Sequence, residues 1–545
     1  MNEIRARAAA RQRLLNALAR ETGAEAGDDQ VRIPLRTAPG ALVAALRYRS
    51  EFGHHAYCDD LFREHPGGDR VPVGHDELVA LVADELAARN GGIGAKAAFV
   101  SQVANSVARS ARYLACDPGC RPTDPAGITR LAEQSVLLGH PFHPTPKSAE
   151  GFNDDELDCY APELGASFQL HYLAVAAELV VEERVTEGPW IPTDVEEKAR
   201  TALRADQADY ALLPVHPWQA AHLGGQPAVR ALIDAGKLVP LGPLGATVYA
   251  TSSVRTVCDP GFGTVWKLPL HVRVTNFIRN NPVEHLRRAA DASRLIAAAA
   301  RDWPHDGFEV LLETGYRTVD PRVVGELTGD FAVLFRCFPF VGSELAPQVL
   351  AGLLEDRLDG SAPALVDLVA QAGPLSADHV AEWLREYLRI SLAPLLAVFT
   401  DDGISFEAHV QNSLLHTENG WPRRFFVRDM EGTSVSRDRV RLDDLPPDSP
   451  ASYDDAEAWM RLRYHFITNH LGHLVHVLGR HTPAGERRLW ALVRDFVREC
   501  PGRYAAELLE SPVLPAKANL LSRFAERGER PLYVEVRNPI CEVNR

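Results

Sequence analysis

The chain of 545 residues is too long for one compact core, so we expect about three or four lobes with clefts between them. Apolar residues make up 46% and charged residues 24%, which is typical of globular proteins and argues against disordered and fibrous classes. The net charge of −15 argues against nucleic acid or an anionic membrane as a partner, because both attract surplus Lys and Arg. Small molecules are the expected partners.

Targeting segments and disulfide frameworks are not expected from the sequence. Residues 1–21 carry the leucine spacing of an amphipathic helix instead of the apolar core of a signal peptide. No stretch approaches the roughly 18 uninterrupted apolar residues of a membrane span. The eight cysteines are dispersed, and Cys116 and Cys120, the one close pair, flank a turn without CxxC spacing. We therefore expect a cytoplasmic protein with reduced cysteines.

The order of apolar patterns predicts an α+β fold. Residues 1–125 are expected to form a largely helical domain, because apolar residues recur every three or four positions over 76–89 and 95–115. A mixed domain of short strands and helices is expected over 126–315. A third domain, over 316–545, should combine an antiparallel sheet with long helices.

The first polar cluster is the proline-rich segment Gly139–Lys147. Its three prolines prevent a regular helix and hold the backbone extended. Side chains of His140, His143 and Lys147 then project from a stiff loop, which suits the binding of an anion. The alternative is a surface loop stiffened by proline, and the HxxHxxxK spacing does not favour a zinc site.

The second cluster combines hydroxyl groups with cations. It contains the sequence TSSVRT at 251–256 and the run from Trp266 to Arg279, whose alternation predicts a strand with Lys267, His271, Arg273 and Thr275 on one face. Hydroxyls, an arginine fork and a lysine together make a cradle for a polyanion. The alternative is a solvated strand face paired with carboxylates.

The third cluster is a predicted hairpin over 404–430. Alternation places Glu407, His409 and Gln411 on one side of its first strand, and a turn at 417–420 leads to a second strand that brings Asp429 near Asn412. Carboxylate and amide oxygens are ligands suited to Mg²⁺. The alternative is a polar sheet face closed by cross-strand pairs.

Other patterns carry less chemistry. His470, His473 and His476 are spaced by three residues among apolar side chains, which favours an amphipathic packing helix over a metal site. The sequence contains no GxxxxGK[ST] loop, no GxGxxG after a strand and no GxSxG elbow. P-loop enzymes, dehydrogenases and serine hydrolases are therefore disfavoured.

Six motifs in one order resemble a known family. They are the segment 139–147, His216-Pro217-Trp218-Gln219, SSxRT at 252–256, KLPL…TN..R at 267–279, ExHxQN at 407–412 and Arg428-Asp429. From about residue 130 to 540 the chain resembles siderophore synthetases of the aerobactin (IucA/IucC) type, which work independently of non-ribosomal peptide synthetases. The resemblance implies a three-lobed hand with a helical thumb, mixed fingers and a palm. It also implies ATP held between fingers and palm, and a homodimer in many members.

The resemblance also implies roles for individual residues. The nucleotide would be held by His140, Lys147, Ser252, Ser253, Arg255, Thr256, Lys267, Asn276, Gln411 and Asn412. The carboxylate substrate would be contacted by His143, Thr275, Arg279, His409 and Lys517. Catalysis would rest on His143, Lys267, Arg279 and His409, with Mg²⁺ held by Glu407 and Asp429.

The implied reaction is the adenylation of a carboxylate. Citrate or a related di- or tricarboxylic acid would attack the α-phosphorus of ATP, and an amine or alcohol would then capture the acyl adenylate. A kinase-like phosphotransferase and a non-catalytic carboxylate- or siderophore-binding homologue are the alternatives. Many family members carry the motif KxRxGF, beginning at the lysine that corresponds to Lys147. In this chain Ala149 replaces the basic residue of the motif and Glu150 follows it, so the acyl or amine pocket is expected to differ.

Overall fold

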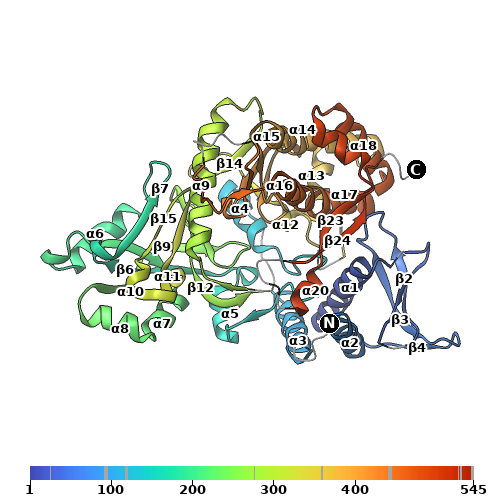
Figure 1. The fold of residues 1–545 in the computed structure, drawn as a ribbon, viewed down its shortest axis with the longest axis horizontal. Helices are drawn as coiled ribbons and strands as arrows, with labels where there is room; N and C mark the ends of the chain where they lie inside the picture. Colours follow the sequence, from blue (N-terminus) through green and yellow to red (C-terminus); the bar gives the residue numbers. More distant parts are fainter. Residues whose placement is uncertain are drawn as a thin grey trace.

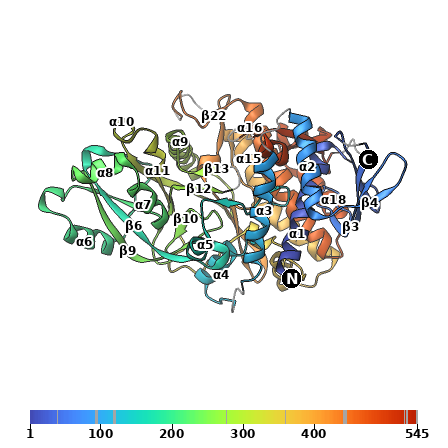
Figure 2. The same cartoon turned by 90° about the horizontal axis from the view of Figure 1, so that it is seen from below.

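The structure is a computed structural model that confirms the α+β fold class. It describes residues 1–24, 26–37, 39–90, 96–116, 121–274, 277–357, 360–439, 445–525, 527 and 531–541. The ribbon is elongated: a large antiparallel sheet with short helices forms one end, and the N- and C-terminal regions lie together at the other (Figure 1). A view from below shows the same division, with the N-terminal helices beside the C-terminal ones (Figure 2).

The N-terminal region contains both helices and a sheet. Its helices are α1 (Asn2–Thr22), α2 (His75–Asn90) and α3 (Lys96–Tyr113), and its antiparallel sheet comprises β1 (Gln30–Pro34), β2 (Ala41–Tyr48), β3 (Ala56–Glu64) and β4 (Arg70–Pro72). The two helices expected from apolar spacing are confirmed. The four-stranded sheet was not predicted, because the short apolar run of β2 is a buried strand, which periodicity cannot distinguish from a helix. Leu520 and Phe524 of α20 (Asn519–Phe524) complete this core.

The middle of the chain forms an eight-stranded antiparallel sheet in the order β7-β15-β16-β11-β10-β9-β6-β8. Its strands are β6 (Ser167–Val175), β7 (Val180–Arg184), β8 (Ala211–Val215), β9 (Leu238–Ala250), β10 (Thr256–Cys258), β11 (Thr264–Lys267), β15 (Glu313–Val319) and β16 (Val333–Cys337). Trp190 stacks on Phe335 with ring centroids 4.2 Å apart, and both belong to the core under the sheet. The helices α6 (Thr193–Ala202), α7 (Pro217–Gly224), α8 (Pro227–Asp234), α10 (Pro321–Val324) and α11 (Thr328–Phe331) surround it (Figure 1).

Pro269 interrupts the strand that alternation predicted from residue 264 to 275. Lys267 ends β11 in the large sheet, whereas β12 (Leu270–Val274) joins a small sheet with β5 (Ala149–Glu150) and β13 (Phe277–Arg279). Proline has no N–H for a ladder, which explains the break. His271 and Arg273 alternate with buried residues on β12 as predicted, but Lys267 does not share their strand or sheet; His271 contacts Asp330 and Arg273 contacts Glu150. Thr275, the fourth residue of the predicted face, lies outside the described residues.

The C-terminal region packs long helices around a sheet in the order β14-β20-β19-β17. Its strands are β14 (Phe308–Leu311), β17 (Gln348–Val349), β19 (Ser413–Glu418) and β20 (Trp421–Arg428), and its helices include α9 (Val283–Ala299), α12 (Leu350–Leu353), α14 (Ala377–Ile390), α15 (Leu392–Asp402), α17 (Gly472–His481) and α18 (Glu486–Glu499). The hairpin turn is confirmed, since Asn419 and Gly420 have positive φ between β19 and β20. The predicted first strand is wrong over 406–412, where β18 (Ile404–Ser405) gives way to a loop.

A π-helix over Arg463–Leu471 precedes α17 and orients several histidines. His470 is fully buried. Its Nε2 is hydrogen-bonded to the hydroxyl of Tyr387, and its Nδ1 lies 2.8 Å from the carbonyl oxygen of Ala408. His476 contacts Glu486 at 2.9 Å. These two side chains have the packing role that the amphipathic pattern predicts.

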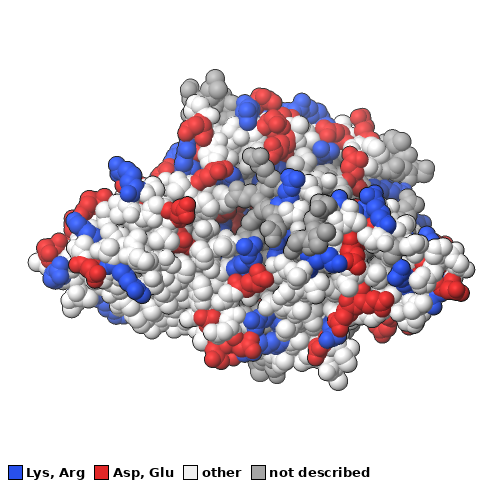
Figure 3. Space-filling model, turned by 60° about the horizontal axis from the view of Figure 1, so that its bottom comes forward, with Lys and Arg blue, Asp and Glu red and all other residues white. Residues whose placement is uncertain are grey.

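The surface carries mixed charge. Figure 3 shows Lys and Arg interspersed with Asp and Glu over one face of the molecule, and no broad basic patch gathers on the part of that face that is described. Within the described ranges, no helix is both long enough and apolar enough to cross a membrane.

Candidate active site

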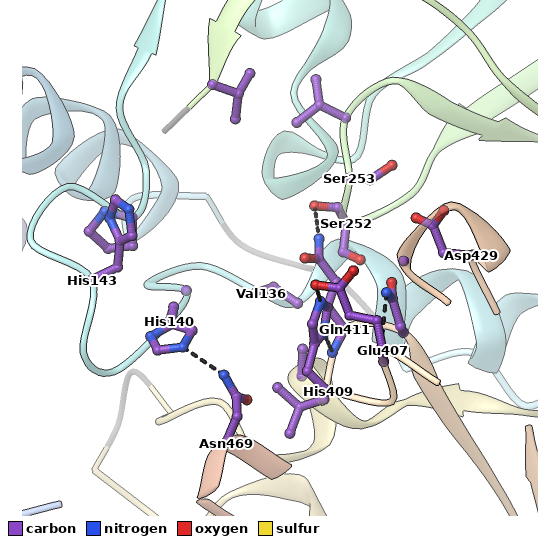
Figure 4. Close-up of a pocket in the computed structure, with 18 of the residues that line it drawn as sticks. Val136, His140, His143, Ser252, Ser253, Glu407, His409, Gln411, Asp429 and Asn469 are labelled. Atoms are coloured by element: carbon purple, nitrogen blue, oxygen red, sulfur yellow. Dashed lines mark hydrogen bonds and ion pairs between the residues drawn. The ribbon is translucent and has the colours of Figure 1, made fainter. Parts of the chain in front are cut away.

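A cavity of about 1120 Å³ lies where the three regions of the chain meet. Fifteen of the predicted site residues line it: His140, His143, Lys147, Ser252, Ser253, Arg255, Thr256, Lys267, Arg279, Glu407, His409, Gln411, Asn412, Asp429 and Lys517. Thr275 and Asn276 lie outside the described residues. Figure 4 shows His140 and His143 on one wall, opposite Ser252, Gln411 and Glu407.

The segment Thr251–Thr256 forms a tight turn between β9 and β10. The backbone N–H of Thr251 donates to the carbonyl of Thr256 at 2.9 Å, and the N–H of Thr256 donates to Oγ of Ser253 at 3.1 Å. Val254 has a φ of 67°, which is an outlier for a β-branched residue and marks stored strain. The turn therefore presents its hydroxyls and amides to the cavity in a fixed geometry.

Glu133, near the end of α4 (Pro125–Gln134), joins this turn to the hairpin. Its carboxylate accepts from the N–H and Oγ of Ser252 at 3.1 and 2.9 Å and pairs with Arg428 at 2.5 Å. Burial alone would raise the pKa of Glu133, but Arg428 and Ser252 outweigh it and hold the pKa below its usual value. Gln411 closes the network by donating to the carbonyl of Ser252 at 2.9 Å (Figure 4). Sequence reasoning missed Glu133, which belongs to no motif.

Lys267 is held by two carboxylates at the end of the hairpin. Its Nζ lies 2.5 Å from Oδ1 of Asp429 and 2.6 Å from Oε2 of Glu431. Arg336 approaches Asp429 at 3.4 Å, and His285 approaches Glu431 at 2.9 Å. Burial would raise the pKa of Glu431, yet Lys267, His285 and Arg255 hold it well below its usual value. Glu431, His285 and Arg336 were missed, although Glu431 lies two residues from the Arg428-Asp429 motif.

The same end of the cavity offers oxygen ligands for a cation. A Cβ built on Gly432 would lie 2.0 Å from Oε2 of Glu407, so this carboxylate approaches the turn that carries Asp429 and Glu431. Carboxylate oxygens suit Mg²⁺, which usually completes its coordination sphere with water and phosphate oxygens. The predicted pair Glu407 and Asp429 thus fits a magnesium ion in donor chemistry.

The opposite wall is built by the proline-rich segment and the π-helix. Nε2 of His140 lies 2.8 Å from Nδ2 of Asn469 (Figure 4). Burial lowers the pKa of His140 well below its usual value, so the imidazole is neutral. Nδ1 of His143 accepts from the N–H of Thr145 at 3.1 Å. Lys147 forms a buried ion pair with Glu163, so its charge is already balanced inside the protein.

Three basic side chains face the middle of the cavity. Burial lowers the pKa of Arg279 to about 10, which leaves it cationic at neutral pH. Burial also lowers the pKa of His409, with Glu407 opposing the change from 3.8 Å. The pKa of Lys517 is lowered by burial too, and its Nζ lies 5.0 Å from the ring centroid of Tyr464.

The remaining wall contains residues that the sequence did not indicate. Gln12, Arg13 and Asn16 of α1 and His54 line the cavity, so the N-terminal region contributes to the site. Ala149, where the motif departs from the family pattern, also lines it. Glu150 is balanced by Arg273 at 3.6 Å.

The fold is that of solved siderophore synthetases. ATP-bound aerobactin synthetase IucA from a hypervirulent pathotype of Klebsiella pneumoniae superposes with a TM-score of 0.85 at 24% identity, over 98% of this chain and 99% of that one. Aerobactin synthetase IucC from the same pathotype gives a TM-score of 0.77 at 21% identity, over 99% of each chain. These likenesses define the class of protein by its fold.

Sequence comparison defines the family. Residues 129–355 match the IucA/IucC family, and residues 381–532 match the family described as ferric iron reductase FhuF-like transporter. L-2,3-Diaminopropanoate–citrate ligase of Staphylococcus aureus (strain NCTC 8325 / PS 47) is 35% identical over 92% of this chain and 90% of its own length. Spermidine–citrate ligase of Bacillus anthracis is 30% identical over 75% of this chain and 73% of its own length. The chain belongs to the IucA/IucC family, and its resemblance to the ligases of siderophore biosynthesis is confirmed.

The Glu133–Arg428 pair gives a stability prediction. Replacing Glu133 with Gln leaves Arg428 buried without its counter-charge, so we expect the free energy of unfolding to fall by about 3–5 kcal/mol. Denaturation in urea measures the change. The control is Glu64→Gln, a carboxylate that pairs with Arg32 and Arg70 at the surface and whose loss should change little. Equal effects of the two substitutions would contradict a central role for Glu133.

The buried histidines give a pH prediction. Burial lowers the pKa of His473 from 6.5 to about 3. Between these values the unfolded state binds the extra proton, so the stability due to a neutral His473 is complete above pH 6.5 and is lost as the pH falls. From pH 7 to 5 the wild type should lose about 2 kcal/mol more than His473→Gln. The quantity to measure is the difference in unfolding free energy between the wild type and His473→Gln at each pH. A difference is needed because burial raises the pKa of Glu21 to about 8, which makes the protein more stable as the pH falls. Parallel pH profiles would refute the assignment.

Proposed function

We propose that the chain activates citrate, or a closely related carboxylic acid, with ATP and Mg²⁺ and condenses the acyl adenylate with an amine. One observation carries the proposal: a single cavity holds a hydroxyl-rich turn at 251–256, the buried cations Lys267 and Arg279, and the carboxylates Glu407 and Asp429. Adenylation brings a carboxylate and a triphosphate together, and it requires this combination of donors, cations and metal ligands.

The nucleotide is bound at the hairpin end of the cavity. Hydroxyls and amides of the turn at 251–256 contact the phosphates, as do Arg255 and Lys267. Before binding, Lys267 is neutralised by Asp429 and Glu431. Asp429 would hold a magnesium ion, whose positive charge would offset the phosphates, and Lys267 would then be free to contact phosphate oxygens. The charges of the site stay balanced in both states.

The acyl substrate is bound beside Arg279, His143, His409 and Lys517. Arg279 supplies a bidentate fork for a carboxylate, and Lys517 adds a second positive charge. His409 has a lowered pKa and is therefore neutral, so it can accept the proton of the attacking amine. Magnesium, when bound, neutralises the phosphate charge as pyrophosphate leaves.

The acceptor is the amine of a small diamino acid. The support is the identity of 35% over 92% of the chain with L-2,3-diaminopropanoate–citrate ligase. The match to spermidine–citrate ligase is lower in identity and covers less of the chain. Ala149, on the cavity wall, makes the pocket differ from relatives with a longer side chain at that position. A homodimer remains a prediction from the resemblance.

Product analysis tests the reaction class. With citrate, L-2,3-diaminopropanoate, ATP and Mg²⁺, we expect AMP and pyrophosphate in equal amounts. Formation of ADP would instead support a kinase-like phosphotransferase, and absence of release with any acid in a panel would support a binding protein. Arg279→Ala and His409→Ala should each abolish most of the carboxylate-dependent release. Normal release by both variants would show that the acyl site lies elsewhere.

Asp429 gives a prediction about the metal. Asp429→Ala removes a magnesium ligand and leaves Lys267 and Arg336 with less counter-charge, so kcat should fall about 100-fold even at saturating Mg²⁺. Steady-state pyrophosphate release measures it. Glu150→Gln is the matched control, because this carboxylate pairs with Arg273 beside the cavity and should retain near-normal kcat. Near-normal turnover of Asp429→Ala would rule out its role as a ligand.

A further inference from the structure

A second group of chemically active side chains lies outside the cavity, where two sequence motifs meet. His222 lies on α7, just after the His216-Pro217-Trp218-Gln219 motif, His271 on β12 and Asp330 on α11. These three elements are neighbours in both ribbon views (Figures 1 and 2). One ligand atom from each of the three side chains lies within 4.8 Å of the other two.

The rings and the carboxylate are held in place by their neighbours. Nδ1 of His271 lies 2.9 Å from Oδ1 of Asp330. The ring of His222 stacks on that of His271 with centroids 4.5 Å apart, and Trp218 also stacks on His222, at 5.6 Å. Asp330 is only 3% exposed, whereas both imidazoles are partly exposed. The group is therefore anchored on the inside and open to solvent on the outside.

Asp330 is a buried carboxylate with little compensating charge. Within the described part of the chain, no Lys or Arg forms an ion pair with Asp330, and His271 is its one ionisable partner. Gln219 supports it by donating to Oδ1 at 3.3 Å, and the same side chain accepts the N–H of His271 at 2.8 Å. Burial of an uncompensated carboxylate is costly, and a bound cation removes that cost. Gln219 has the position of an outer residue that orients metal ligands.

We propose that His222, His271 and Asp330 bind a divalent transition-metal ion, with Zn²⁺ as the ion of best fit. Two imidazoles and one carboxylate are a zinc ligand set, and the solvent side provides the fourth position for water. The site is separate from the proposed catalytic cavity, and the proposal does not rest on the proposed function.

The ion would clamp α7 and α11 to β12. Leu270, next to His271, pairs with Arg279 across the β12–β13 ladder. Arg279 lines the catalytic cavity. Zinc therefore stabilises the strand whose partner carries a substrate-binding residue, and we expect it to raise the thermal midpoint of the protein.

Zinc titration of the full chain tests the proposal. After treatment with a chelator and dialysis, calorimetric titration with ZnCl₂ should show binding that depends on the three residues. His222→Ala and Asp330→Asn should each weaken it by about 100-fold or more. Co²⁺ should give the visible absorption of a four-coordinate site in the wild type and lose it in both variants.

Two controls make the result specific. His65→Ala removes an imidazole from the turn between β3 and β4, and Asp429→Ala removes a carboxylate from the cavity. Both variants should bind zinc at His222, His271 and Asp330 with the affinity of the wild type. Asp330→Asn changes no volume, so it keeps the test valid if His222→Ala does not fold. Wild-type affinity in Asp330→Asn, or loss of zinc binding in Asp429→Ala alone, would overturn the proposal and leave His271–Asp330 as a hydrogen-bonded pair.

Discussion

The buried carboxylate of Glu133 is the point on which the geometry of the cavity depends. It is 2% exposed and contacts both Ser252 of the strained turn and Arg428 of the hairpin. These residues come from three distant segments, so one ion pair aligns the turn at 251–256 with the hairpin. A buried pair is costly to desolvate and contributes little net stability, but loss of one partner is strongly destabilising. The main effect of the Glu133–Arg428 pair is that it fixes the turn at 251–256 and the hairpin relative to each other.

The second constraint is charge balance. Positive side chains and carboxylates are concentrated at one end of the cavity. The ion pairs of Lys267 with Asp429 and Glu431 balance part of the positive charge and part of the negative charge there. A site that binds a triphosphate together with a cation needs both positive and negative side chains. Burying side chains of one charge without the other would cost too much free energy. The ion pairs seen here balance the buried charges, and in the proposed function the same groups would exchange these partners for nucleotide and metal.

The sequence predicted which side chains lie together better than it predicted the local structure. Every predicted site residue that is described lines the cavity, because the motifs record side-chain chemistry directly. The strand predicted over 404–412 is a loop beyond Ser405, yet Glu407, His409 and Gln411 still face the cavity. Alternation is a weak guide where a functional loop has the composition of a strand. Glu133 escaped prediction for a different reason: its role depends on a contact with Arg428, 295 residues away, which no local pattern records.

Pro269 links the catalytic cavity to the proposed metal group. It ends the ladder of β11 and redirects the chain, so Lys267 faces the hairpin carboxylates while His271, four residues later, faces Asp330. One short segment thus places a cation in the cavity and an imidazole outside it. Because β12 pairs with the strand that bears Arg279, any force that fixes His271 also limits the movement of Arg279. The break in the strand, which sequence alternation did not reveal, is the feature that places this segment in two separate environments.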